Sequence, residues 1–73
     1  MFDYSKLRGR IVEKFGTITN FAERLSISRV SVDYKLNNKV QISRSDIIEW
    51  SKLLDISPEE YGIYFFTQKL NSE

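Results

Sequence analysis

The stretch from residue 17 to residue 38 constrains the fold most, because its apolar positions predict two short helices joined by a tight turn. In each helix the apolar residues lie three or four positions apart and form one inward stripe, Phe21, Ala22 and Leu25 in the first and Val32 and Leu36 in the second. Ile27 is expected to fill the turn between them. Two stripes joined by so short a turn must cross steeply, which leaves the outer face of the second helix exposed.

Residues with capping chemistry mark the ends of these helices and of the one before them. A first helix is predicted over about residues 3–15, and Gly16 follows it as a residue that accepts the left-handed cap. Thr17 and Ser28 are the expected N-caps of the two motif helices. The pair at 37–38, both asparagine, tolerates the left-handed geometry that ends the second motif helix.

Two later segments carry the same capping signals. Ser43 and Asp46 have the spacing of a capping box, and residues 57–60 repeat it with proline at the first helical position. No stretch alternates apolar and polar residues as a strand does. The sequence therefore predicts an all-α fold, with a single domain over residues 1–66 and a polar tail over residues 67–73 that frays.

Packing must stabilise so short a chain, because it has 73 residues and no cysteine for a disulfide. At about 25 cal/mol per Å² of buried apolar surface, each large apolar side chain contributes about 1.5 to 3 kcal/mol. The predicted core consists of Leu7, Ile11, Phe15, Phe21, Ala22, Leu25, Ile27, Val32, Leu36, Ile47, Trp50, Leu53, Leu54, Ile56, Tyr61 and Phe65.

The motif and the segments after it resemble the phage repressor and Cro family of helix-turn-helix proteins. The resemblance is carried by Phe21-Ala22 to Leu25, Ile27-Ser28-Arg29 to Val32, Leu36-Asn37, and the later runs 46–48, 53–56 and 64–66. Among small phage proteins the chain is most similar to Cro-like regulators and to modulators of repression. This resemblance implies a compact five-helix, lambda-repressor-like domain, operator binding by the second motif helix, and frequent dimerisation. Ser26 departs from the glycine common in that family, and a left-handed backbone there would cost about 1 kcal/mol.

Composition excludes several classes of protein. Cysteine and histidine are both absent, so thiolate or imidazole metal sites and the usual nucleophile–base pairs cannot be built. We therefore predict no enzyme activity, no catalytic residue, no metal and no cofactor. No apolar stretch approaches the roughly 20 residues that span a bilayer, and the N-terminus lacks the order of a signal peptide. The expected location is the cytoplasm of a bacterial host cell, without membrane contact.

The net charge of +1 hides a division between the two parts of the chain. Residues 1–44 carry nine basic and four acidic side chains, a net of +5, whereas residues 45–73 carry two basic and six acidic side chains, a net of −4. A basic part that contains the motif is typical of a protein with one nucleic-acid face. The alternative is that these charges only cover solvated helix faces.

The second motif helix is predicted to read DNA bases. Its groove-facing residues, taken from the helical phase of Val32 and Leu36, are Arg29, Val30, Ser31, Tyr34 and Lys35. Arginine can donate two hydrogen bonds to guanine, serine can bond either base pair, and valine can contact a thymine methyl. In the alternative, Val30 and Tyr34 pack within the protein and Arg29 binds phosphate or pairs with Asp33. A carboxylate at position 33 would be repelled near a groove unless it accepts a hydrogen bond from cytosine or is neutralised by Arg29.

Phosphate contacts are expected on both sides of that helix. Thr17, Thr19 and Asn20 lie at the start of the first motif helix, where free backbone N–H groups favour anions. Lys39 and Arg44 lie in the loop after the second motif helix, within reach of a DNA strand. The alternative is that these are ordinary polar loop residues.

The acidic C-terminal part carries more aromatic rings than a short segment can bury. Tyr61, Tyr64, Phe65 and Phe66 are therefore predicted to form a protein interface, although some of this surface belongs to the core. The partner is either a second copy, which would set two recognition helices about 34 Å apart, or a cognate repressor.

The sequence leaves three candidate functions. The leading one is a Cro-like transcriptional regulator of a phage genetic switch that binds double-stranded operator DNA. The alternative is a modulator of repression that binds a cognate phage repressor, with or without DNA. A small enzyme or cofactor binder is disfavoured because the chain has no glycine-rich phosphate loop and no carboxylate pair at a recognisable spacing.

Overall fold

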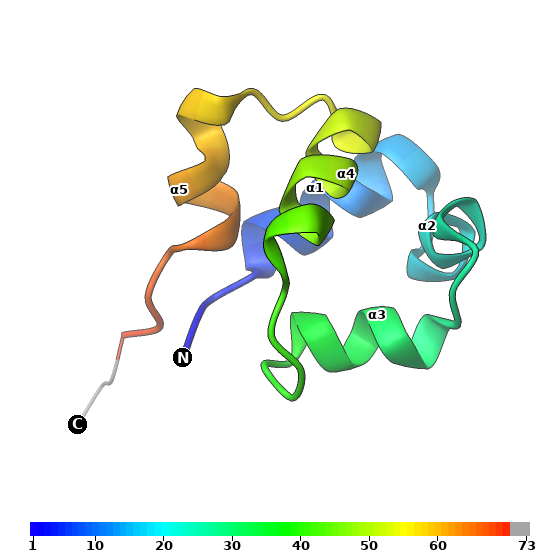
Figure 1. Cartoon of the computed structure of the whole chain (residues 1–73), viewed down its shortest axis with the longest axis horizontal. Coiled ribbons are helices and arrows are strands. Elements are labelled where there is room, and N and C mark those ends of the chain that lie inside the picture. The colour runs from blue at the N-terminus through cyan, green and yellow to red at the C-terminus, as the bar shows by residue number, and fades with distance from the viewer. Residues whose placement is uncertain (71–73) are drawn as a thin grey trace.

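The computed structural model describes residues 1–70, and they adopt the all-α fold that the sequence predicts (Figure 1). In chain order the elements are α1 (Ser5–Phe15), α2 (Ile18–Leu25), α3 (Arg29–Leu36), α4 (Arg44–Leu54), the short 3-10 helix η1 (Pro58–Glu60) and α5 (Tyr61–Phe65). Within this range, β pairing is confined to one antiparallel bridge between Phe2 and Gln68. The end of the predicted polar tail, residues 71–73, lies outside the described residues.

The helix ends of the motif follow from local side-chain chemistry, as predicted. Thr17 Oγ1 accepts a hydrogen bond from the Asn20 backbone N–H at 3.0 Å, and Ser28 Oγ accepts one from Ser31 at 3.1 Å. Gly16 ends α1 with a φ of 86°, in the left-handed region that favours glycine. Each cap satisfies a backbone group that the helix itself leaves free.

The later helices begin with the two predicted capping boxes. Ser43 Oγ accepts from the Asp46 backbone N–H at 3.1 Å, and the Asp46 carboxylate accepts from the Ser43 N–H at 3.0 Å. Ser57 and Glu60 form the second box, which leads into η1 and then α5. The sequence pattern thus located both helix starts because its partners lie three residues apart.

The turn between α2 and α3 corrects one prediction. Ser26 adopts a left-handed backbone with a φ of 61°, although it carries a Cβ. Ile27, predicted to fill the turn, is 37% exposed, and that prediction is wrong. Its backbone N–H bonds the Ala22 carbonyl at 3.1 Å, so the main chain closes the turn, while the buried side chains of Ala22 and Val32 supply the apolar contact.

The core forms where α1, α2 and α4 meet. The rings of Phe21 and Trp50 pack edge to face with centroids 5.1 Å apart, and Phe15 lies 5.3 Å from Phe21 on the other side. Apart from Ile27, the other predicted core residues are buried or half-buried against this cluster. Three buried hydrophobic residues were not predicted, Tyr4, Ile18 and Ile42. Tyr4 and Ile42 lie outside the helices, so helical spacing could not identify them.

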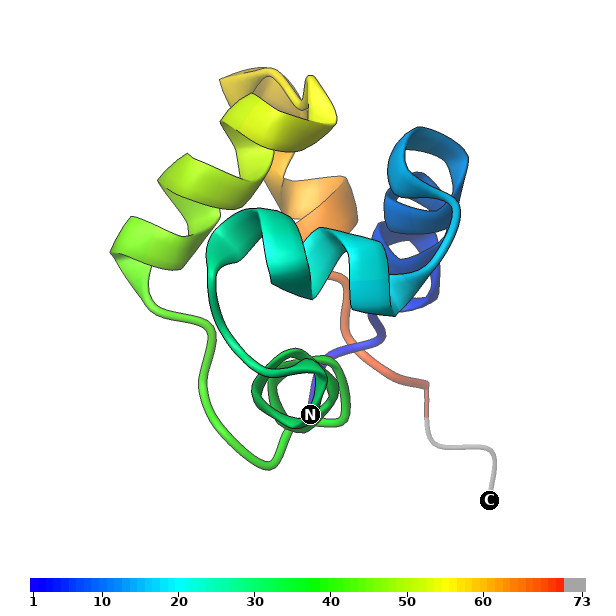
Figure 2. The ribbon, with the colours of Figure 1, turned by 90° about the vertical axis from the view of Figure 1, so that its right-hand side faces the viewer.

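The position of α3 at the edge of the molecule decides what it can contact. Figure 2 shows α3 end-on below α2, with α4 and α5 on the far side of α2. Among residues 1–70, α3 makes its main helix contact with α2, and its buried residues are Val32 and Leu36. Its outer face is therefore available to a partner.

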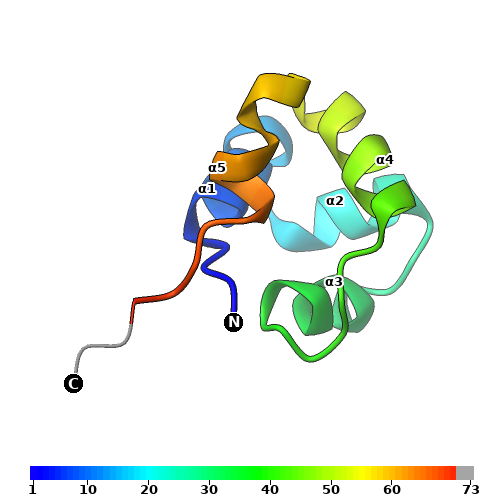
Figure 3. The ribbon, with the colours of Figure 1, turned by 60° about the vertical axis from the view of Figure 1, so that its left-hand side comes forward.

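Residues 1–3 lie beside residues 67–69, close to the C-terminal end of α3 (Figure 3). The Asp3 N–H bonds the Thr67 carbonyl at 2.8 Å and the Lys69 N–H bonds the Met1 carbonyl at 3.0 Å. The Asn38 side chain accepts from the Phe2 N–H at 3.0 Å and donates to the Phe2 carbonyl at 2.8 Å. We call residues 1–3, residues 67–69 and Asn38 the terminal clasp. The start of the predicted polar tail is thus paired with the N-terminus.

Candidate functional site

The outer face of α3 carries three of the five residues predicted to read bases. Arg29, Val30 and Tyr34 are exposed, while Val32 and Leu36 point into the core, as the helical phase indicates. The three side chains therefore share one solvent-facing strip. Base reading by this strip stays a prediction.

The Arg29 side chain, at the charged end of this strip, is bonded to other residues of the same chain. Arg29 Nε lies 3.3 Å from the Asp33 carboxylate, and Arg29 Nη1 donates to Thr19 Oγ1 at 3.3 Å. Ser31, predicted to face the groove, is half-buried and bonds Ser28 through its N–H and its hydroxyl. The N-terminal turn of α3 is therefore a closed hydrogen-bonded cluster.

Lys35 does not share the solvent-facing strip. Its Nζ donates to the Asp46 carboxylate at 2.7 Å, and the two side chains are only 19% and 17% exposed. Burial by itself raises the pKa of Asp46, but hydrogen bonds from Lys35 and Ser43 outweigh it and lower that pKa. The predicted position of Lys35 toward a groove is corrected here, because the capping carboxylate of α4 lies within its reach.

The residues predicted to contact phosphate fall into two separate groups. At the start of α2, Thr17 caps the helix and Asn20 Nδ2 donates to the Phe15 carbonyl at 2.8 Å, while Thr19 contacts Arg29. Lys39 and Arg44 are exposed; Lys39 follows α3, whereas Arg44, predicted in the loop, is the first residue of α4. Together the two groups flank α3, and their role in phosphate binding stays a prediction.

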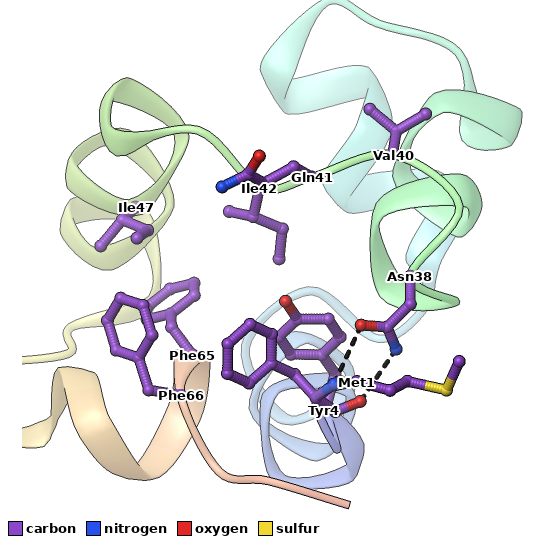
Figure 4. Close-up of a pocket in the computed structure, with 10 residues that line it drawn as sticks. Met1, Tyr4, Asn38, Val40, Gln41, Ile42, Ile47, Phe65 and Phe66 are labelled. Carbon is purple, nitrogen blue, oxygen red and sulfur yellow. Dashed lines mark hydrogen bonds between the residues drawn. The ribbon is translucent and has the colours of Figure 1, made fainter.

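A second candidate surface lies between the loop after α3, the start of α4 and the end of α5. Two contiguous hollows of about 410 and 480 Å³ share Gln41, Ile42, Ile47 and Phe66. Figure 4 shows Ile42, Ile47 and Phe66 around the first hollow, with the Asn38 side chain bonded at its far edge. We call the joined hollows the aromatic groove. Its lining residues are Met1, Phe2, Tyr4, Asn38, Val40, Gln41, Ile42, Arg44, Ile47, Ile48, Tyr61, Phe65 and Phe66.

The four aromatic residues predicted at a protein interface have different environments. Tyr61 and Phe66 line the groove, and Phe66 is 50% exposed. Tyr64 does not line it, since its ring lies under the Arg10 guanidinium, 5.8 Å from the centroid. Phe65 also lines the groove, but it is 1% exposed and belongs to the core, so its role at an interface stays a prediction. The phase of α5 turns Phe65 inward and leaves its neighbour Phe66 outward.

Several groove residues were missed in the sequence. Val40 is exposed in a loop, Ile48 is exposed on α4, and Phe2 lies beside Phe66 with ring centroids 5.9 Å apart. The one sequence signal was the pair Ile47-Ile48, because two adjacent apolar residues cannot both face the same core. The groove residues come from four segments of the chain, so their convergence depends on the tertiary structure.

Metal-ligand groups and membrane-spanning helices are the next features to consider. In residues 1–70 no group of three acidic side chains is placed to hold a metal ion. No helix in the same range is long and apolar enough to cross a membrane. The arrangement offers one exposed helix face and one apolar groove, both suited to binding a macromolecule.

Comparison with known proteins identifies the family. A family model described as "protein of unknown function (DUF739)" matches residues 1–68. A search of curated proteins finds no match. Among solved structures, the chain is similar to the modulator of repression of the temperate bacteriophage TP901-1 from Lactococcus lactis, with 38% identity and a TM-score of 0.81 over 96% of this chain and 95% of that one. This chain therefore belongs to the DUF739 family and shares its fold with a phage modulator of repression.

Proposed function

We propose that this chain is a modulator of phage repression that binds a cognate repressor protein through the aromatic groove. The observation that carries the proposal is the groove itself, a contiguous apolar hollow whose walls include half-exposed Val40, Ile48 and Phe66. The similarity to a phage modulator of repression supports the same function. This role places the chain inside the bacterial host cell and requires no catalytic chemistry.

The groove has the composition of a protein interface. Large aromatic side chains at its centre give binding energy, while polar residues at the rim exclude water. Phe66 supplies the exposed ring, and Gln41 and Arg44 supply the polar rim. Truncating a well-packed aromatic residue in such a position costs about 2 kcal/mol or more of binding free energy.

The test is a binding titration of the purified cognate repressor with matched valine variants. Val40 in the groove and Val12 on α1 are 45% and 49% exposed, so Val40→Ser and Val12→Ser remove equal apolar surface from two different places. We expect Val40→Ser and Phe66→Ser to weaken the complex at least about tenfold and Val12→Ser to leave it unchanged. Size-exclusion chromatography and calorimetry measure the complex, and circular dichroism checks each fold. An equal effect of the two valine variants, or no complex with the wild type, would refute the proposal.

Operator binding is a second candidate function, and the exposed strip of Arg29, Val30 and Tyr34 favours it. In this role the strip enters the major groove, the groups at Thr19 and Lys39 contact phosphates, and a homodimer sets the spacing. Gel shifts of an operator fragment with Arg29→Ala at two salt concentrations test it. Unchanged affinity would remove the proposed base contact.

A further inference from the structure

We propose that Asp33 keeps DNA off α3, because its carboxylate neutralises Arg29 and disfavours DNA on the exposed strip. The comparison with repressor binding rests on the proposed function. The strip is otherwise suited to DNA, since it lies in the basic part of the chain, which has a net charge of +5 over residues 1–44. The two cations of α3, Arg29 and Lys35, are nevertheless not free to contact DNA.

Both cations of α3 are paired with carboxylates. Arg29 pairs with Asp33 one turn further along the same helix, and Lys35 pairs with Asp46 of α4. The second pair is only 17–19% exposed, and Asp46 also caps α4, so that pair is part of the fold. The side chains of the first pair are 56% and 32% exposed, so that pair is more accessible to solvent. Asp33 is therefore the acid that can be changed without loss of structure.

The geometry at Arg29 interferes with both kinds of DNA contact. Asp33 accepts from Nε at 3.3 Å and Thr19 accepts from Nη1 at 3.3 Å, so two nitrogens of the guanidinium that would face guanine or phosphate are already engaged. A DNA contact by Arg29 must break these bonds. The Asp33 carboxylate would then stand beside the phosphates, where it repels them.

Asp33 neutralises charge only at the N-terminal turn of α3, because other cations near this helix are not paired with it. Among residues 1–70, the four ion pairs do not include Lys39, Arg44 or Arg24. The flanks of α3 therefore stay positive while its N-terminal turn is neutral. Removal of the Asp33 carboxylate would leave Arg29 without its anionic partner and would raise the net charge of this part of the chain by one. Exposed pairs of this kind contribute little to folding, so the variant is expected to fold.

The experiment measures binding of a mixed-sequence double-stranded DNA fragment by fluorescence anisotropy, at about 50 and 200 mM salt. The variants are Asp33→Asn, which keeps the shape, Asp33→Ser as a second removal of the charge, and Arg29→Ala combined with Asp33→Asn. Glu59→Gln is the control, since it changes the net charge equally in η1, away from α3. The same proteins are titrated with the cognate repressor.

We expect both Asp33 variants to bind DNA roughly three- to tenfold more tightly at the lower salt. The slope of log affinity against log salt concentration should also steepen, by about the value of one phosphate contact. The double variant loses this gain, and Glu59→Gln stays within about twofold of the wild type. Repressor binding by Asp33→Asn stays at the wild-type level, because the groove is formed by other residues.

Several results would overturn the inference: no gain in DNA affinity, a gain equal to that of Glu59→Gln, or no DNA binding by any variant. A loss of affinity in Asp33→Asn would also overturn it and would indicate that Asp33 accepts a hydrogen bond from cytosine. The two proposals fail separately. A wild type that does not bind repressor refutes the proposed function, whereas the DNA titration alone decides the role of Asp33 in excluding DNA.

Discussion

The aromatic groove begins in the loop that follows α3, but it differs from the outer face of α3 in how its chemical groups are satisfied. On α3 the charged groups are already paired, Arg29 with Asp33 and Lys35 with Asp46. In the groove, Val40, Ile48 and Phe66 leave apolar surface in water. An exposed apolar hollow gains free energy when a partner covers it, whereas paired charges must first lose their partners. The comparison therefore favours a protein ligand over DNA.

The sharpest contrast within the groove is between Phe65 and Phe66, which are adjacent in sequence but 1% and 50% exposed. We expect Phe65→Ala to lower the free energy of unfolding by about 3–5 kcal/mol, because it leaves a cavity in the core. Phe66→Ala should cost about 1 kcal/mol or less and act on repressor binding instead. Urea unfolding measures both, with Phe65→Leu as a milder core variant. Equal destabilisation by the two alanine variants would contradict the separation of core and groove.

The Lys35–Asp46 pair is predicted to be structural, in contrast to the exposed pair at Arg29. Asp46→Asn should lower the free energy of unfolding by about 2 kcal/mol, because it weakens both the pair and the capping box. Asp33→Asn should change it by less than about 0.5 kcal/mol. Chemical denaturation at neutral pH compares the two variants, and a similar cost for both would show that the pairs are equivalent.

The same pair predicts a pH dependence. The pKa of Asp46 is lowered in the folded protein, so its contribution to stability is present above the ordinary carboxyl pKa of 3.8 and is lost as the pH falls through the lower folded value. Thermal unfolding between about pH 2 and 6 should show a loss of stability on the acid side that is smaller in Asp46→Asn. Identical acid profiles of the wild type and the variant would be inconsistent with this assignment.

Asn38 joins the two surfaces, because it follows α3 and bonds Phe2 in the wall of the groove. Asn38→Gly keeps the left-handed backbone but loses both side-chain bonds, which should cost about 1 kcal/mol. Asn38→Ala adds the strain of a φ of 63° and should cost about 1 kcal/mol more. Denaturation midpoints and amide exchange at Phe2 report both effects. If Asn38→Gly left the exchange of Phe2 unchanged, the terminal clasp would not depend on Asn38.

The smallest expected effect concerns the turn that sets the position of α3. Ser26 has a left-handed φ of 61°, so Ser26→Gly removes strain but adds freedom to the unfolded chain. We expect a net stabilisation of about 0.5 kcal/mol, measured as a rise in melting temperature, with no change in repressor binding. A clear destabilisation would show that the serine side chain itself supports the turn.

Sequence reasoning worked best where the physical cause is local. The caps at Thr17, Ser28 and Ser43 join atoms only three residues apart, so residue type and spacing were sufficient. The same reasoning misplaced Ile27 and Lys35. The exposure of Ile27 depends on how the main chain closes the turn. The position of the Lys35 side chain depends on a carboxylate eleven residues away in another helix.

The amino-acid sequence by itself determined the all-α class, the boundaries of the motif helices and the phase that turns Val32 and Leu36 inward, because these follow from backbone hydrogen bonding and helical periodicity. Only the tertiary structure decided which aromatic rings are core and which remain in water, and it assembled the groove from the N-terminus, the loop after α3, α4 and α5. Residues distant in the chain meet only when the helices pack, and packing depends on the whole core at once.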